Sequence, residues 1–339
     1  MEKERNYKLD CLKFFLIFGV VFGHFGWQYA EKDYTLGALC FWIYTFHMPA
    51  FVFVSGLLSK QTIRERRWYK FVPYLILYFI MKAIENFRIM LCTGEAAPWD
   101  FFHEDFVAWY AFAMFWLFLV TTLVRNVKPL YVLIVSLVIA VISGYSPKID
   151  SFLVIQRSIN FFPFFYAGYL LDVDKLLEFL KKKWVIITSI LLLTGIFAAC
   201  MIFYNELGFW QKLFRGRFSY EMILGNYSFG GLWRAFAYVL SFALTFALLA
   251  VMPNRKSIFS TLGGRTLPVY MLHAYIQLAL NDWPWFREWF LSSHVALKSL
   301  VGTVILVAVL SLKPLESVTR MIMNVPMLNS DRETAEKKV

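Results

Sequence analysis

Long apolar segments that alternate with short polar connections are the feature that most constrains this sequence. Ten stretches are interpreted as membrane spans, at residues 8–30, 38–58, 69–91, 106–124, 129–144, 158–172, 184–204, 231–252, 265–281 and 295–313. Hydrophobic residues make up 59% of the 339-residue chain, more apolar surface than a water-soluble protein of this size could bury. The sequence therefore predicts an all-α polytopic membrane protein, a bundle of about ten transmembrane helices.

The connections between these segments fall into two sets that differ in charge. One set is rich in lysine and arginine, as at 59–70 and 181–183, whereas the other holds more acidic and aromatic residues. Because cytoplasmic connections carry the excess of cations, the alternation predicts that both termini are cytoplasmic. The net charge of +11 thus reflects topology, and no nucleic-acid-binding motif accompanies it, so a nucleic-acid partner is not expected.

Residues 1–324 are predicted to form a single transmembrane domain, followed by a flexible cytoplasmic tail at 325–339. The first apolar segment is long and lacks a small-residue cleavage site, so we expect it to be retained as a span. The longest external connection, 205–230, is rich in aromatic residues and contains Arg215 and Arg217. It is interpreted either as an exterior substrate surface or as interfacial packing.

The cysteines show no pattern that binds a metal. All of them lie in or beside apolar segments without metal-ligand spacing, namely Cys11, Cys40, Cys92 and Cys200. Each is interpreted as a small structural residue, and no metal is predicted.

Ionisable residues in the first apolar segment indicate a path into the membrane. Lys13 and His24 are eleven positions apart, so they share one helix face about 16 Å apart along the axis. Asp10 lies on the same side, one turn before Lys13. Ionisable groups within a membrane helix usually face a cavity, a partner or a substrate path. Taken singly, Lys13 could reach to the interface and His24 could be a hydrogen-bonded structural residue.

Two further apolar segments place ionisable groups at a similar depth. His47 lies near the middle of the second segment, where Pro49 can kink the span and free backbone groups to line a cavity. Glu85 lies in the third segment near the level of His24, where a carboxylate would orient the imidazole ring. The alternative for Glu85 is an ion pair with Arg88, one turn away on the same helix.

Two arginines and three histidines in the remaining segments can be interpreted as structural residues or as functional ones. Arg64 and Arg67 precede the third segment; such a run usually anchors topology, but guanidinium groups also bind phosphate through paired hydrogen bonds. His273, in the ninth segment, is favoured as a structural histidine. His103 and His294 lie in external connections and are interpreted as surface residues.

Taken in order, these motifs resemble the bacterial integral-membrane acyltransferases of the acyltransferase 3 family, most closely its fucose 4-O-acetylase-like branch. The resemblance covers about residues 5–315. Six motifs carry it: Leu9-Asp10-Cys11-Leu12-Lys13 with His24, Phe46-His47-Met48-Pro49 with Ser55-Gly56, Arg64 and Arg67 before Pro73-Tyr74, Trp109-Tyr110, Arg157 before Phe164-Phe165 and Gly168, and Tyr270 with His273. Lys13 departs from the commoner arginine, which keeps the charge but loses bidentate geometry.

The resemblance implies transfer of an acyl group from cytoplasmic acyl-CoA, most often acetyl-CoA, to a glycan or lipid-linked saccharide hydroxyl. The site would lie in a bacterial plasma membrane, with membrane lipid around it. A transporter or flippase for a lipid-linked sugar also fits intramembrane charges, although no inverted repeat or pair of broken helices is visible. A scaffold without chemistry would leave the face shared by Lys13 and His24 unexplained.

The residue pattern and the resemblance together assign roles to individual residues. His24 is the expected catalytic base and Glu85 its orienting partner, with an acyl-histidine intermediate left open. The cations expected at the CoA phosphates are Lys13, Arg64 and Arg67. The residues expected to position substrate or shape the cavity are Asp10, His47, Arg157, Tyr270 and His273.

Overall fold

The computed structural model describes residues 6–65, 67–95, 97–149, 151–225 and 228–324. Within these ranges the chain is helical and contains no β-strand. The all-α prediction is therefore confirmed, whereas the predicted tail at 325–339 lies outside the described residues. Each predicted span coincides with a long helix or helix pair: α1 (Tyr7–Trp27), α2 (Tyr34–Tyr44) with α3 (His47–Arg64), α4 (Val72–Thr93), α5 (Trp109–Val124), α6 (Pro129–Ser143), α7 (Ile155–Leu170), α9 (Lys183–Ile202), α13 (Gly230–Val251), α15 (Thr266–Asn281) and α17 (Val295–Leu310).

Only some of these helices are long and apolar enough to cross a bilayer by themselves. In the described part of the chain four candidates meet that standard: α1, α2 with α3 as one span, α9 and α13. A fifth arises if α17 is joined to α18 (Lys313–Met323), from which it is bent by 64°. The structure therefore supports several apolar spans, and ten spans with cytoplasmic termini stay a prediction.

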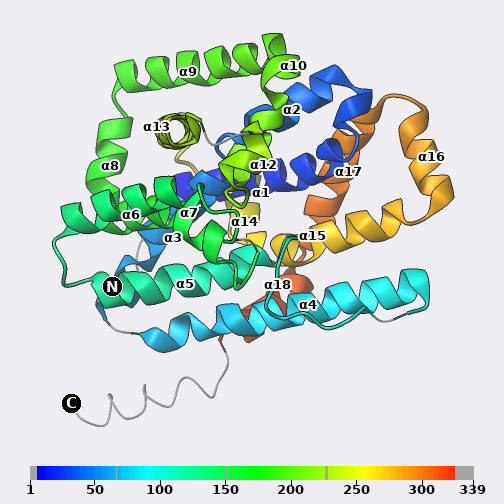
Figure 1. Cartoon of the computed structure of the whole chain (residues 1–339), viewed down its shortest axis with the longest axis horizontal. Helices are drawn as coiled ribbons and strands as arrows, with labels where there is room; N and C mark the ends of the chain where they lie inside the picture. The colour runs from blue at the N-terminus through cyan, green and yellow to red at the C-terminus, as the bar shows by residue number, and fades with distance from the viewer. Residues whose placement is uncertain (1–5, 66, 96, 150, 226–227, 325–339) are drawn as a thin grey trace.

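Shorter helices fill the connections. They are α8 (Val173–Leu180), α10 (Tyr204–Leu207), α11 (Gln211–Arg215), α12 (Tyr220–Leu224), α14 (Ile258–Gly263) and α16 (Pro284–Ser292). In Figure 1, α1 lies in the middle of the bundle, whereas α9 and α16 lie at its edges. Most of α1 is buried, while most of α9 is not, which fits a central and a peripheral helix.

The second predicted span is broken just before His47. α2 ends at Tyr44 and α3 begins at His47, so the break lies upstream of Pro49. Pro49 occupies the first turn of α3, where its missing N–H leaves no helical hydrogen bond unmade. The carbonyl of Thr45, just before the helix, accepts a hydrogen bond from Ser241 of α13 at 2.6 Å.

α15 runs alongside α1 in the same direction. At the start, α14 approaches α1 so closely that a Cβ on Gly263 would clash with the carbonyl oxygen of Asp10. Further along, the Gln277 side-chain amide donates to the carbonyl of Val21 at 3.0 Å. At the far end, the Tyr29 hydroxyl donates to Asn281 at 2.6 Å. These contacts fix the position of α15 along α1.

α3 and α7 cross at two glycines that belong to the sequence motifs. A Cβ on Gly56 would clash with the carbonyl oxygen of Phe165, and one on Gly168 would clash with that of Phe53. Small residues let membrane helices approach to backbone contact. The Ser-Gly and Phe-Phe-x-x-Gly motifs therefore contain a packing device that fixes α3 against α7.

Candidate active site

A cavity of about 920 Å³ follows α1. Lys13, Ile17, Val20 and His24, one helical stripe, all line it, and the lining continues to Gln28. The expectation that this face of the first span looks into the bundle is therefore confirmed. Fifteen residues of helix separate Lys13 from Gln28, which is roughly 22 Å. We call the part around Lys13 the lysine end and the part around Trp27 and Arg215 the arginine end.

At the lysine end, Lys13 is paired on its own helix. Its ammonium group lies 2.8 Å from a carboxylate oxygen of Asp10. Asp10 is buried and is not among the residues that line the cavity. The walls beyond Lys13 are largely apolar, with Ile17, Val54 and Leu58. Asp10 therefore positions Lys13 and does not itself face the cavity.

Three histidines meet in the middle of the cavity. The rings of His24 and His273 lie 5.1 Å apart between centroids, and His47 lines the same space. The Nδ1 atom of His47 lies 2.9 Å from the carbonyl of Ile43, and that of His273 lies 2.8 Å from the carbonyl of Val269. Each Nδ1 can therefore donate a hydrogen bond, which leaves the Nε2 lone pair of the neutral ring free.

His24 differs from the other two histidines. It is half-buried, and none of the described residues makes a hydrogen bond to its ring. The Nε2 atom of His273 is buried and also has no hydrogen-bond partner in the described ranges. His24 is thus the imidazole that is best placed to accept a proton from a bound molecule.

Arg157 and Tyr270 hold the connection between α4 and α5 against the cavity. The Arg157 guanidinium donates to the carbonyls of Asp105 and Phe106, both at 3.3 Å, and stacks over Trp109 at 4.8 Å. The Tyr270 hydroxyl donates to the carbonyl of Val107 at 2.8 Å and accepts from the backbone of α5 at 3.0 Å. Both residues line the cavity, and both shape its wall through backbone contacts.

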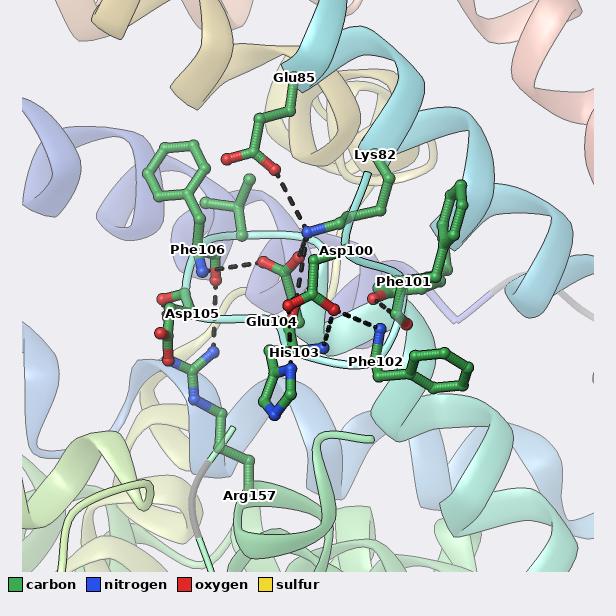
Figure 2. A network of polar contacts seen from close by, with 12 residues as sticks. Lys82, Glu85, Asp100, Phe101, Phe102, His103, Glu104, Asp105, Phe106 and Arg157 are labelled. Atoms are coloured by element: carbon green, nitrogen blue, oxygen red, sulfur yellow. Dashed lines mark hydrogen bonds and ion pairs between the residues drawn. The ribbon is translucent and has the colours of Figure 1, made fainter. Parts of the chain in front are cut away.

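Figure 2 shows the polar network on the other side of that connection. The Lys82 ammonium lies 3.1 Å from the buried carboxylate of Glu104 and 3.7 Å from that of Glu85. Further out, backbone N–H groups of His103 and Phe102 donate to Asp100 and hold the pKa of its carboxyl below the usual range. Glu104 also accepts a hydrogen bond from the backbone N–H of Phe106 at 2.8 Å, so the network supports a segment that lines the cavity.

The structure does not bring Glu85 to His24. Glu85 is absent from the cavity lining, and its nearest cation is Lys82, one turn earlier on α4. The alternative partner, Arg88, pairs instead with Asp282 at 2.6 Å. The position of a residue along a helix does not determine which way its side chain points.

Arg64 and Arg67 also lie away from the cavity. Arg64 is exposed at the last turn of α3, and Arg67 pairs with the carboxylate of Glu65. Tyr74, from the same motif, does line the lysine end. The structure therefore brings Lys13 to the cavity and leaves both arginines outside it.

Arg215 is a cavity residue whose role the sequence did not single out. Its guanidinium lies 5.3 Å from the ring of Trp27 and 5.4 Å from that of Tyr44, measured to the ring centroids. Asn160 of α7 donates to the carbonyl of Gly216 at 3.0 Å and so pins the end of α11. The aromatic and basic character of 205–230 was the available signal, but only the fold places Arg215 in the cavity.

A hydroxyl pair joins two of the motifs. The Ser55 hydroxyl donates to the carbonyl of Phe51 at 2.9 Å, so the Tyr110 hydroxyl, 2.8 Å away, donates to Ser55. Both residues line the cavity.

Among the residues that the structure describes, no group of three or more His, Cys, Asp or Glu is arranged to hold a metal ion.

The family model of the acyltransferase 3 domain, described as an acyltransferase domain, matches residues 6–312. The chain belongs to the acyltransferase 3 family. Comparisons with curated proteins and with solved structures find no match. As an acyltransferase 3 protein with several apolar helices, the chain is a membrane acyltransferase. Each of the six acyltransferase 3 motifs contributes at least one residue to the cavity: Lys13 and His24, His47 and Ser55, Tyr74, Trp109 and Tyr110, Arg157, and Tyr270 and His273.

Proposed function

We propose that the protein transfers an acyl group, most often acetyl, from acyl-CoA to a hydroxyl of a glycan or lipid-linked saccharide. It would do so in a bacterial plasma membrane, as an enzyme of the fucose 4-O-acetylase-like branch. The observation that carries the proposal is the cavity itself. One continuous space leads from the cation Lys13 past an unbonded imidazole, His24, to a polar and aromatic opening.

The donor fits the lysine end. Lys13 would meet a CoA phosphate, and the pantetheine arm would lie along the apolar side chains Ile17, Val20 and Val54. The roughly 16 Å of helix between Lys13 and His24 would bring the thioester to the histidines. Arg64 and Arg67, outside the cavity, would meet only the nucleotide portion that protrudes from it.

The acceptor fits the other side of His24. His24 would take the proton from the acceptor hydroxyl as its oxygen attacks the thioester carbonyl. The carbon–sulfur bond then breaks, and the leaving CoA thiolate takes the proton from the imidazolium, so that an ester and free CoA result. In an acyl-histidine route, His24 would attack the thioester first and expel the CoA thiolate; the acceptor hydroxyl would then attack the acyl group, lose its proton to the thiolate and release His24.

The other two histidines would position the acceptor. The free Nε2 atoms of His47 and His273 can accept hydrogen bonds from sugar hydroxyls. Arg157 and Tyr270 would support that site indirectly, through the backbone that they hold. With Glu85 turned toward Lys82, we propose that it stabilises the closed connection and does not orient His24.

The test is acyl transfer by the purified protein in lipid nanodiscs. Radiolabelled acetyl-CoA is supplied with an extract of cell-surface glycans, and free CoA and labelled glycan are both measured. We expect the two products to form in equal amounts. Mass spectrometry of surface glycans from cells with and without the gene would then identify the acetylated residue.

A transporter for a lipid-linked sugar would also use a polar cavity through a helix bundle. It predicts that saccharide crosses the membrane of a proteoliposome without release of CoA. Movement of the sugar with acetyl-CoA left intact would replace the acyltransferase proposal.

A further inference from the structure

We propose that the acceptor carries an anionic group, a carboxylate or a phosphate, which binds Arg215 at the arginine end of the cavity. This inference rests on the proposed function, because it names the class of saccharide that the same cavity takes. It starts from an imbalance of charge among the residues that line the cavity.

The cavity holds more cations than its own carboxylates can match. Within the described ranges its lining includes five cations, Lys13, Lys32, Arg157, Arg215 and Arg287, and two carboxylates, Glu31 and Asp105. Lys13 already has Asp10. Glu31 and Lys32 are neighbours at the exposed rim and offset each other. The remaining three cations are all arginines.

The Asp105 carboxylate is already engaged by another arginine. It lies 2.5 Å from the guanidinium of Arg217, a residue that does not line the cavity. Arg157 uses its N–H groups on backbone carbonyls. In the part of the chain that the structure describes, no carboxylate lies within ion-pair distance of Arg215.

Hydrogen bonds from two long helices fix the position of Arg215. It is the last residue of α11, which ends at Gly216 in the left-handed conformation (φ 69°). Asn160 of α7 bonds the carbonyl of Gly216, and Arg234 of α13 bonds that of Leu213. The connection is thus fastened to two long helices. A guanidinium held in advance loses little freedom when it binds an oxyanion through paired hydrogen bonds.

The aromatic contacts leave the charge of Arg215 uncompensated. The rings of Trp27 and Tyr44 attract the guanidinium, but an aromatic ring carries no net charge. A neutral sugar bound here would displace water from Arg215 and offer no counter-charge, which is costly for a partly buried cation. An anionic acceptor supplies that counter-charge.

The anion would belong to the acceptor and not to CoA. Arg215 stacks on Trp27, which is fourteen helical residues from Lys13, or roughly 21 Å. A donor with its phosphates at Lys13 reaches His24 with its thioester, which leaves Arg215 on the far side of the reacting atoms. The two ends of the cavity would therefore recognise two different anions.

The experiment compares three small acceptors in nanodiscs with radiolabelled acetyl-CoA: methyl glucuronoside, glucose 1-phosphate and methyl glucoside. We expect kcat/KM for an anionic acceptor to exceed that for the neutral one by roughly tenfold or more, the usual worth of a charged hydrogen bond. The two anionic arms distinguish a carboxylate from a phosphate. Arg215→Gln should remove the preference, and Arg215→Lys should retain part of it.

Lys212→Gln is the matched control. Lys212 lies on the same short helix and carries the same charge, but it is exposed and does not line the cavity. Its loss should leave the preference for the anionic acceptor as in wild type. Two results would overturn the inference: equal kcat/KM for all three acceptors, or a preference for the anionic acceptors in Arg215→Gln as large as in wild type. Neither result would contradict acyl transfer itself.

A second measurement does not depend on turnover. Phenylglyoxal modifies arginine, and mass spectrometry of peptides reports its reaction at Arg215. Methyl glucuronoside or inorganic phosphate should protect Arg215, whereas methyl glucoside should not. If no acceptor is acetylated, the proposed function fails while this protection can still be seen. Protection that is the same with all three compounds would contradict an anion site at Arg215.

Discussion

The two ends of the cavity treat their cations differently. At the lysine end, Lys13 has a carboxylate partner on its own helix, Asp10, at 2.8 Å. At the arginine end, Arg215 rests on the rings of Trp27 and Tyr44 without a carboxylate in the described part of the chain. A phosphate at Lys13 must share the ammonium group with Asp10, whereas an anion at Arg215 meets no competing carboxylate among the described residues.

The side chains that line the two ends of the cavity also differ. Ile17, Val20 and Val54 make the lysine end aliphatic, which suits a slender arm, while the arginine end is aromatic and polar, which suits a sugar. His24 lies where the two halves join. Binding energy for the donor and for the acceptor would thus come from opposite sides of one catalytic group, and the predictions below test that division.

The largest loss of acyl-transfer activity is expected at His24, where the two halves of the cavity join. His24→Ala should lower acyl transfer by roughly 10² to 10⁴-fold, the usual contribution of a general base. Binding of CoA should persist, since the lysine end is unchanged. Initial rates and CoA binding are measured on the same nanodisc preparation.

A surface histidine provides the control for that variant. His103 is exposed and pairs with Asp100 outside the cavity. His103→Ala should transfer acetyl as wild type does. A His24→Ala protein that works near the wild-type rate would mean that the proton goes elsewhere, and the histidine cluster would need another explanation.

A smaller effect is expected at the lysine end. Lys13→Gln should raise KM for acetyl-CoA by roughly tenfold, the cost of one charge-assisted contact, and leave KM for the acceptor in place. Lys13→Arg keeps the charge and should stay near wild type. Steady-state kinetics with each substrate varied in turn make the comparison. A change confined to the acceptor KM would reverse the assignment of the two ends.

The smallest effect is expected at Arg64 and Arg67, which lie outside the cavity. Replacing both with lysine keeps the charge that sets topology but removes the planar fork. Because exposed ion pairs contribute little, affinity for acetyl-CoA should fall by at most about fivefold. Equilibrium binding of CoA measures it. A loss larger than that of Lys13→Gln would move the phosphate site out of the cavity.

Helical periodicity and hydropathy were enough to predict part of this arrangement. Lys13 and His24 were placed on one face because a helix repeats every 3.6 residues, and both line the cavity. A kink at Pro49 was expected, but the chain breaks before His47 instead, because proline fits the first turn of a helix.

Features that depend on contacts between distant segments escaped the sequence. Glu85 turns toward Lys82 and does not line the cavity, because depth along a helix does not specify direction around its axis. Arg215 enters the cavity through a connection held by Asn160 and Arg234, and no local pattern encodes such contacts. The close contact between α3 and α7, by contrast, depends on Gly56 and Gly168, which both belong to sequence motifs. Small residues of this kind are the usual signal of close helix packing in membranes.

The central claim is that donor and acceptor meet through one continuous cavity, and Val20 is the place to test it. Val20 lines the cavity between Lys13 and His24. Val20→Trp should block acetyl transfer and CoA release together, while Val239→Trp, on the exposed face of α13, should be silent. A cysteine at Val20 should be labelled by a thiol reagent and protected by CoA. Transfer at the wild-type rate by Val20→Trp, with no protection of that cysteine by CoA, would contradict the through-cavity account.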